Sequence, residues 1–149
     1  MNNGMGLVYK TDINAPLKTV WDALTNPEVV KLYFFGTQLE TSWMPGSPIA
    51  FRGEWEGVMY EDKGTVQAFE PQRRLSYTYW SSFSGKADTQ ENYANIAFEV
   101  VGHGDGCYVT VTQDGFDNLE QLEHSEKNWG MVFNKLKALL ELKNASVPV

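Results

Sequence analysis

The first part of the chain contains two different hydrophobic periods. From Leu7 to Asn14 apolar and polar residues alternate, which is typical of a half-buried strand. Pro16 ends this alternation and suits the first turn of a helix. The apolar residues that follow recur three and four positions apart, as on one face of a helix: Leu17, Val20, Trp21 and Leu24. A strand followed by a short amphipathic helix is therefore predicted.

A second short helix is predicted directly after the first. Thr25-Asn26-Pro27 interrupts the first helix, and Asn26 can cap a new one that has Pro27 at its first position. Gly36 ends it. The apolar side of this helix consists of Val29, Val30, Tyr33 and Phe34.

After Gly36 the period changes to two, which predicts a series of strands. Turn-forming residues such as Met44-Pro45-Gly46-Ser47 and Gly102-His103-Gly104-Asp105-Gly106 separate the strands, so hairpins and an antiparallel sheet are expected. The polar, serine-rich stretch 81–92 is predicted to be a loop. The six strands are predicted at Thr37–Trp43, Pro48–Trp55, Met59–Glu70, Arg73–Ser82, Tyr93–Gly102 and Cys107–Gly115.

The last segment returns to helical spacing and predicts a long helix between Asp117 and Lys143. Asp117 and Glu120 have the spacing of a capping box. The polar run Glu123–Asn128 predicts a break or bend before the main part of the helix. Gly130 is unfavourable inside a helix by about 1 kcal/mol relative to alanine, so it is expected to serve close packing or to leave space beside the helix.

The predicted order is β-α-α-β6-α with an antiparallel sheet, which is the order of the helix-grip (Bet v 1/START-like) fold in the α+β class. Three motifs agree with this order. The first, Ile13-x-Ala15-Pro16-x-x-x-Val20-Trp21-x-Ala23-Leu24-Thr25-x-Pro27-Glu28, resembles the strand-to-helix signature of the AHSA1-like (activator of Hsp90 ATPase homologue 1-like) family of the SRPBCC superfamily. The others are Gly64-Thr65-Val66 with Pro71-x-Arg73-x-Leu75-x-Tyr77-x-Tyr79, and Thr110-x-Thr112 before a helix with Trp129, Leu136 and Leu139.

This resemblance extends from about Leu7 to Leu142 within one predicted domain, residues 1–149. One position departs from it. Related sequences usually have Gly-Trp in the terminal helix, whereas this chain has Asn128-Trp129 followed by Gly130. The resemblance implies a fold more firmly than a reaction, because such a broad family includes co-chaperone domains, carriers of small molecules and proteins without known activity.

Charge and composition exclude several classes of function. A net charge of −7 is unfavourable for binding nucleic acid or anionic membranes, both of which attract clustered Lys and Arg. Cys107 is the only cysteine, and residues 1–6 do not form a recognisable signal peptide, so a cytoplasmic location is expected. No stretch has the length and apolar character of a transmembrane helix.

Aromatic residues make up 13% of the chain, which suits either a broad core or a cavity lining. A curved sheet around one helix leaves its concave face incompletely filled, so a cavity is expected there. Tyr77 and Tyr79 are of special interest because a polar ligand group can satisfy a buried hydroxyl. The full candidate lining, each member of which has core filling as its alternative role, is Phe34, Trp43, Phe51, Trp55, Tyr77, Tyr79, Phe98, Trp129 and Phe133.

The chain contains few residues that could bind a metal ion or act in catalysis. His103, His124 and Cys107 are the only nitrogen and sulfur candidates, so neither a metal site nor a cofactor is predicted. Glu54 and Glu56 flank Trp55 and share one strand face. If that face lines the cavity, a desolvated glutamate there has a raised pKa and can act as a general acid or base; otherwise both side chains are solvated.

Three functions follow from these observations. The leading hypothesis is a binding protein whose cavity takes a small apolar or amphipathic molecule. The second is an interaction module that contacts a chaperone or another protein, as the resemblance implies. The third is a cyclase-like or hydrolase-like enzyme that uses the carboxylates of Glu54 and Glu56.

Overall fold

The computed structural model describes residues 5–145, and the side chains of residues 5–141. Every predicted strand and helix is present, and the α+β helix-grip architecture is confirmed. The elements are β1 (Met5–Ile13), α1 (Leu17–Thr25), α2 (Pro27–Tyr33), β2 (Gln38–Thr41), β3 (Pro48–Trp55), β4 (Val58–Glu70), β5 (Arg74–Tyr79), the 3-10 turn Gln90–Asn92, β6 (Ala94–His103), β7 (Gly106–Phe116) and α3 (Leu119–Ala145).

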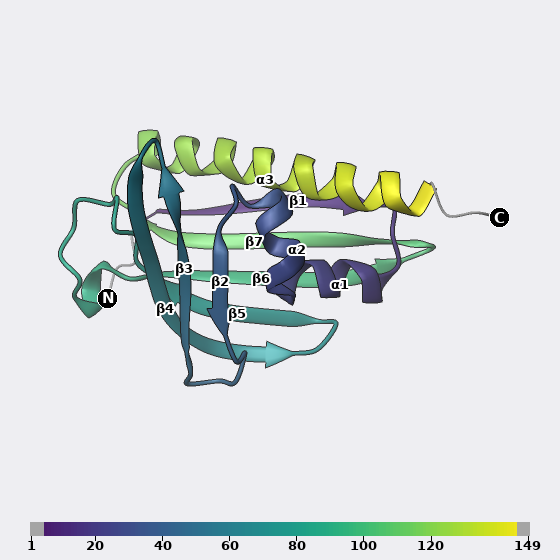
Figure 1. Ribbon diagram of the computed structural model, residues 1–149, viewed down its shortest axis with the longest axis horizontal. Helices are drawn as coiled ribbons and strands as arrows, with labels where there is room; N and C mark the ends of the chain where they lie inside the picture. Colours follow the sequence, from purple (N-terminus) through teal and green to yellow (C-terminus); the bar gives the residue numbers. More distant parts are fainter. Residues whose placement is uncertain (1–4, 146–149) are drawn as a thin grey trace.

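The seven strands form one antiparallel sheet in the order β1-β7-β6-β5-β4-β3-β2. The sheet bends strongly through β4, so that β3 and β2 cross in front of the other strands, and α3 runs alongside β1 (Figure 1). The two short helices α1 and α2 lie inside this bend (Figure 1). The resulting core fills the space between the concave face of the sheet and the helices.

Two strands are shorter than predicted. β2 ends at Thr41 because Trp43 has a positive φ of 62°, which is outside the strand region. β5 ends at Tyr79, and beyond it Trp80 forms only an isolated bridge with Lys63. The predicted strand boundaries are wrong at these ends because apolar alternation continues past the last paired residue.

The predicted break in the terminal helix is wrong, since α3 is continuous from Leu119. Its polar run mostly faces solvent, while Leu122 and Trp129 continue the inward stripe. The helix cap is also one residue later than predicted. The Asn118 side chain accepts a hydrogen bond from the Gln121 backbone N–H at 2.9 Å, and the Gln121 side chain accepts one from the Asp117 N–H at 2.8 Å.

Gly130 of α3 faces the ring of Tyr9 on β1. A Cβ atom at Gly130 would lie 3.4 Å from the Tyr9 hydroxyl oxygen. The glycine therefore leaves a small space between the helix and β1, which agrees with the sequence-based expectation.

Candidate functional site

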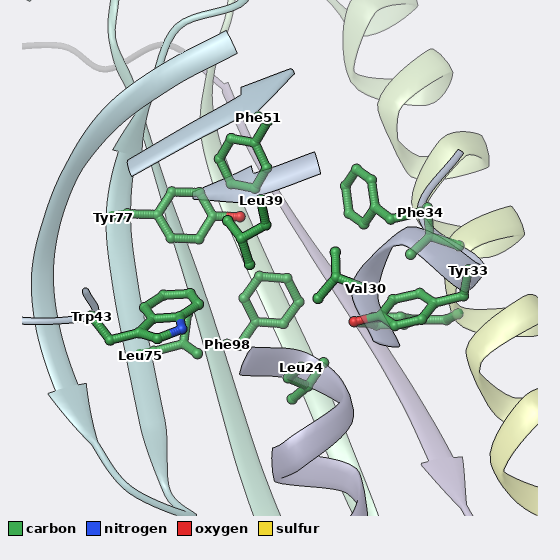
Figure 2. A pocket seen from close by; sticks show the side chains of 12 residues that line it. Leu24, Val30, Tyr33, Phe34, Leu39, Trp43, Phe51, Leu75, Tyr77 and Phe98 are labelled. Atoms are coloured by element: carbon green, nitrogen blue, oxygen red, sulfur yellow. The ribbon is translucent and has the colours of Figure 1, made fainter. Parts of the chain in front are cut away.

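A pocket lies between the concave face of the sheet and all three helices (Figure 2). Aromatic side chains dominate its wall, and within the described part of the chain none of its lining residues carries a charge. The space that the centre of a water molecule can occupy is about 20 Å³, which is room for about one water. The lining residues are Leu24, Val30, Tyr33, Phe34, Leu39, Trp43, Phe51, Leu75, Tyr77, Phe98, Val132 and Phe133.

The alternation of side chains along each strand explains which sheet residues point into the pocket. Phe51 of β3, Tyr77 of β5 and Phe98 of β6 occupy inward positions of their strands. The neighbouring strands β5 and β6 pair Tyr77 with Ile96 and Leu75 with Phe98. The Phe51 and Tyr77 ring centroids are 5.5 Å apart, and those of Tyr77 and Phe98 are 6.5 Å apart. These rings form a continuous aromatic wall.

The helical side of the wall comes mainly from α2. Asn26 caps this helix by accepting the Glu28 N–H at 3.0 Å, and the helix then presents Val30 and Tyr33 to the pocket. Phe34 follows at the C-cap and contacts Phe51, with 6.4 Å between ring centroids. Phe34, which the sequence analysis proposed as a lining residue, thus lies at the pocket together with Val30 and Tyr33.

Most polar groups of the wall have partners within the protein. The Tyr33 hydroxyl donates to the Ala23 carbonyl oxygen at 2.8 Å, and the Trp43 indole N–H donates to the Thr25 carbonyl oxygen at 2.9 Å. Both acceptors belong to the last turns of α1, where carbonyls lack helical partners. Burial raises the pKa of Tyr33, so its hydroxyl stays protonated at neutral pH.

Comparisons with known proteins agree with this architecture. Residues 14–141 match the family described as Activator of Hsp90 ATPase homolog 1-like protein. The chain belongs to this AHSA1-like family. The solution structure of ChR145 from Cytophaga hutchinsonii has 40% sequence identity, covers 98% of this chain and 100% of its own, and gives a TM-score of 0.84.

More distant solved structures share the fold alone. MLL2253 from Mesorhizobium loti has 22% identity and a TM-score of 0.75, covering 92% of this chain and 97% of its own. The Aha1 dimer from Colwellia psychrerythraea has 16% identity and a TM-score of 0.72, covering 92% and 96%. A comparison with curated proteins found no match.

Most of the aromatic residues singled out in this AHSA1-like chain line the pocket: Phe34, Trp43, Phe51, Tyr77, Phe98 and Phe133. Trp129 is buried just behind the wall, where it contacts Phe34 and Phe98 and donates its indole N–H to Gln113 at 2.8 Å. Tyr79 contacts Phe51, but its hydroxyl donates to Asp62 at 2.6 Å. These two residues support the wall from outside.

Trp55 is not in the pocket. Its side chain is 53% exposed and makes an edge contact with Phe35, with ring centroids 6.1 Å apart. Trp55 is the last residue of β3, next to the two-residue turn at Glu56 and Gly57, and this end of the hairpin extends beyond the core. Trp55 points to the same side of β3 as Phe51, but it is not buried, because the core does not extend to this end of the hairpin.

The carboxylates of Glu54 and Glu56 are also exposed, outside the pocket lining. The structure thus offers no desolvated environment for the acid-base role considered from the sequence. Among the described residues the buried acid is instead Asp62 of β4, 8% exposed, which accepts hydrogen bonds from the Tyr79 hydroxyl and, at 3.0 Å, from the Ser82 N–H.

Sequence reasoning missed several aliphatic lining residues and Tyr33. The helical spacing from Val30 to Tyr33 could have indicated both as lining residues, because both belong to the apolar side of the predicted second helix.

Among the described residues, no group of three or more His, Cys, Asp or Glu could hold a metal ion. Within residues 5–145, no helix combines the length and apolar character needed to cross a bilayer.

Proposed function

We propose that this AHSA1-like chain binds a small, mostly apolar molecule in the pocket between the sheet and the helices. The aromatic, uncharged wall carries the proposal, because such linings are typical of small-molecule sites. The space in the pocket suffices only for about one water, so a larger ligand has to displace a side chain.

Phe34 is the side chain best placed to move. It is partly exposed and lies at the end of α2, followed by a turn in which the Thr37 N–H donates to the Phe34 carbonyl at 3.0 Å. Phe35 and Gly36 both have positive φ, 55° and 72°. Because a bulky residue rarely adopts positive φ, the turn at Phe35 stores strain of about 1–3 kcal/mol that a rearrangement can release.

Replacement of Phe34 with alanine is expected to strengthen ligand binding. The uncharged fluorescent probe N-phenyl-1-naphthylamine should give a saturable increase in emission, with a dissociation constant about tenfold lower for Phe34→Ala than for the wild type. The reason is that binding no longer has to displace the ring, which removes the free-energy cost of reaching the open state.

Phe83→Ala is the matched control, because Phe83 is 53% exposed and contacts Tyr60 outside the pocket. Its probe affinity should equal that of the wild type. Absence of saturable binding in both the wild type and Phe34→Ala, with folded protein by circular dichroism, would show that the pocket is packed core.

We propose as a second candidate function that the chain contacts a chaperone of the Hsp90 type. An exposed aromatic pair, Phe35 and Trp55, favours it, together with Met59, which is 75% exposed. Aromatic residues of this kind are enriched at protein interfaces. The family description supports the choice of partner.

Addition of the chain to Hsp90 is then expected to raise the ATPase rate of the chaperone. Trp55→Ala should abolish most of this increase, because truncation of a central aromatic residue commonly costs about 2 kcal/mol of binding free energy. Val8→Ala, at a residue that is 66% exposed on β1, should leave the rate increase intact. An unchanged ATPase rate with the wild-type chain would count against this function.

A further inference from the structure

The two hydroxyls that line the pocket, those of Tyr33 and Tyr77, differ in their hydrogen bonds. Tyr77 is only 4% exposed, and none of the side-chain hydrogen bonds formed among residues 5–141 involves its oxygen. Figure 2 shows this hydroxyl pointing into the pocket, toward the space between Leu39, Phe51 and Phe34. Tyr77 therefore presents an unpaired polar group to any molecule that enters.

The Tyr77 oxygen lies at the surface of the pocket and is not sealed inside the core. Among the described residues, no fully enclosed side-chain nitrogen or oxygen lacks a hydrogen-bond partner, so an unpartnered oxygen has to touch open space. Burial raises the pKa of Tyr77, and the group stays a neutral phenol that can both donate and accept.

Water is a poor partner for this hydroxyl. A buried water is well held when it makes two to four hydrogen bonds to the protein. The Tyr33 hydroxyl and the Trp43 N–H already donate to backbone carbonyls, so the Tyr33 oxygen, as an acceptor, is the one other side-chain polar atom that the described wall offers to a water. A ligand oxygen that arrives together with its own apolar body satisfies Tyr77 and keeps the remaining wall in apolar contact.

A charged ligand does not fit this wall. Within the described part of the chain, the lining contains neither acid nor base, so an ionised group would be desolvated without a counter-charge. The nearest buried acid on the same side of the sheet, Asp62, is already bonded to Tyr79 and Ser82.

We infer that the ligand of this pocket is a neutral, ring-containing apolar molecule with one carbonyl or hydroxyl oxygen, which accepts a hydrogen bond from Tyr77. This inference rests on the proposed ligand-binding function and names the ligand class. Tyr77 sets the specificity, while the aromatic wall supplies the apolar contact.

Three probes of similar shape test the ligand class: acetophenone, isopropylbenzene and benzoate. They carry a ketone, a hydrocarbon and a carboxylate on the same ring. Binding is measured by nuclear magnetic resonance from the methyl signals of Val30 and Leu39, which line the pocket. Acetophenone and isopropylbenzene should shift these signals saturably, and benzoate should not.

Tyr77→Phe removes only the hydroxyl. It is expected to weaken acetophenone binding about tenfold, the usual effect of one neutral hydrogen bond, and to leave isopropylbenzene binding unchanged or tighter. Tyr108→Phe is the matched control, because Tyr108 lies outside the pocket and contacts His103 and Lys10. This control should change neither affinity.

The possible outcomes distinguish ligand binding in the pocket from selection of the ligand by Tyr77. If neither neutral probe shifts the wild-type signals, ligand binding in this pocket is wrong. If both bind but Tyr77→Phe affects them equally, the pocket binds apolar molecules without selection by Tyr77. Saturable benzoate binding to the wild type overturns the neutral class even if the Tyr77 variant is not folded.

Discussion

Replacement of Gly64 with alanine is expected to destabilise the fold by at least about 4 kcal/mol, a large part of the stability of a typical domain. Gly64 lies in the middle of β4 and pairs with Ile49 of β3. A Cβ atom there would lie 1.6 Å from the carbonyl oxygen and 2.4 Å from the carbonyl carbon of Thr78. Both contacts are with backbone, so a change of side-chain rotamer does not relieve them.

Relief of this clash requires local separation of β4 from β5. Lys63 and Trp80 exchange two backbone hydrogen bonds, 3.0 and 2.8 Å long, and the Thr65 N–H donates to the Thr78 hydroxyl at 2.9 Å. A shift of the backbone at Thr78 would lengthen these bonds together. The strand that carries Tyr77 and Tyr79 would move with it, so the pocket wall would be lost as well.

Urea unfolding followed by circular dichroism measures this effect. Gly102→Ala is the matched control in β6, because a Cβ atom at Gly102 meets nothing within 4 Å. The control should remain within about 0.5 kcal/mol of the wild type. A Gly64→Ala protein whose unfolding free energy is within 1 kcal/mol of wild type would show that the sheet accommodates a side chain at this position.

The sequence predicted the element order well because each strand and helix has its own period and ends in turn-forming residues. Strand ends were less predictable. Trp55 has the parity of an inward residue, but whether the core reaches that far depends on the length of the hairpin relative to the helices. Gly64 was visible as a motif residue, yet its close approach to Thr78 depends on the pairing of β4 with β5.

The helix start illustrates the same limit at short range. Asp117 and Asn118 are both good N-cap residues, with Glu120 and Gln121 respectively three positions later. Local preference does not choose between the two registers. In the structure Asp117 pairs with Lys86 of the loop after β5 at 2.8 Å, and Asn118 caps the helix.

Tyr77 and Tyr79 show what sequence parity leaves undecided in the site. The two tyrosines point to the same side of β5, so the sequence pattern favours neither hydroxyl over the other as the partner of a ligand. Asp62 distinguishes them because it accepts the Tyr79 hydroxyl from the neighbouring strand. The pairing of β4 with β5 in the structure thus satisfies the Tyr79 hydroxyl, and the Tyr77 hydroxyl stays available to a ligand.

Replacement of Asp62 with alanine is expected to destabilise the protein by about 3 kcal/mol, because it removes the buried carboxylate that accepts hydrogen bonds from the Tyr79 hydroxyl and the Ser82 N–H. The loss should also loosen the pocket wall, since the Tyr79 and Phe51 ring centroids are only 5.8 Å apart. Asp105→Ala, at an exposed turn residue, is the control and should change stability by less than about 0.5 kcal/mol.

A double-mutant cycle with Tyr79→Phe separates the hydrogen bond from other effects of Asp62. Tyr79→Phe alone should cost about 1.5–3 kcal/mol, since it removes a hydrogen bond to a carboxylate. In the Asp62→Ala background the same substitution removes a hydroxyl that has lost its partner, so it should cost little or even stabilise the protein. Urea unfolding of all four proteins gives the interaction free energy. Additive losses would mean that Asp62 stabilises the fold through Ser82 and its loop, with little contribution from its contact with Tyr79.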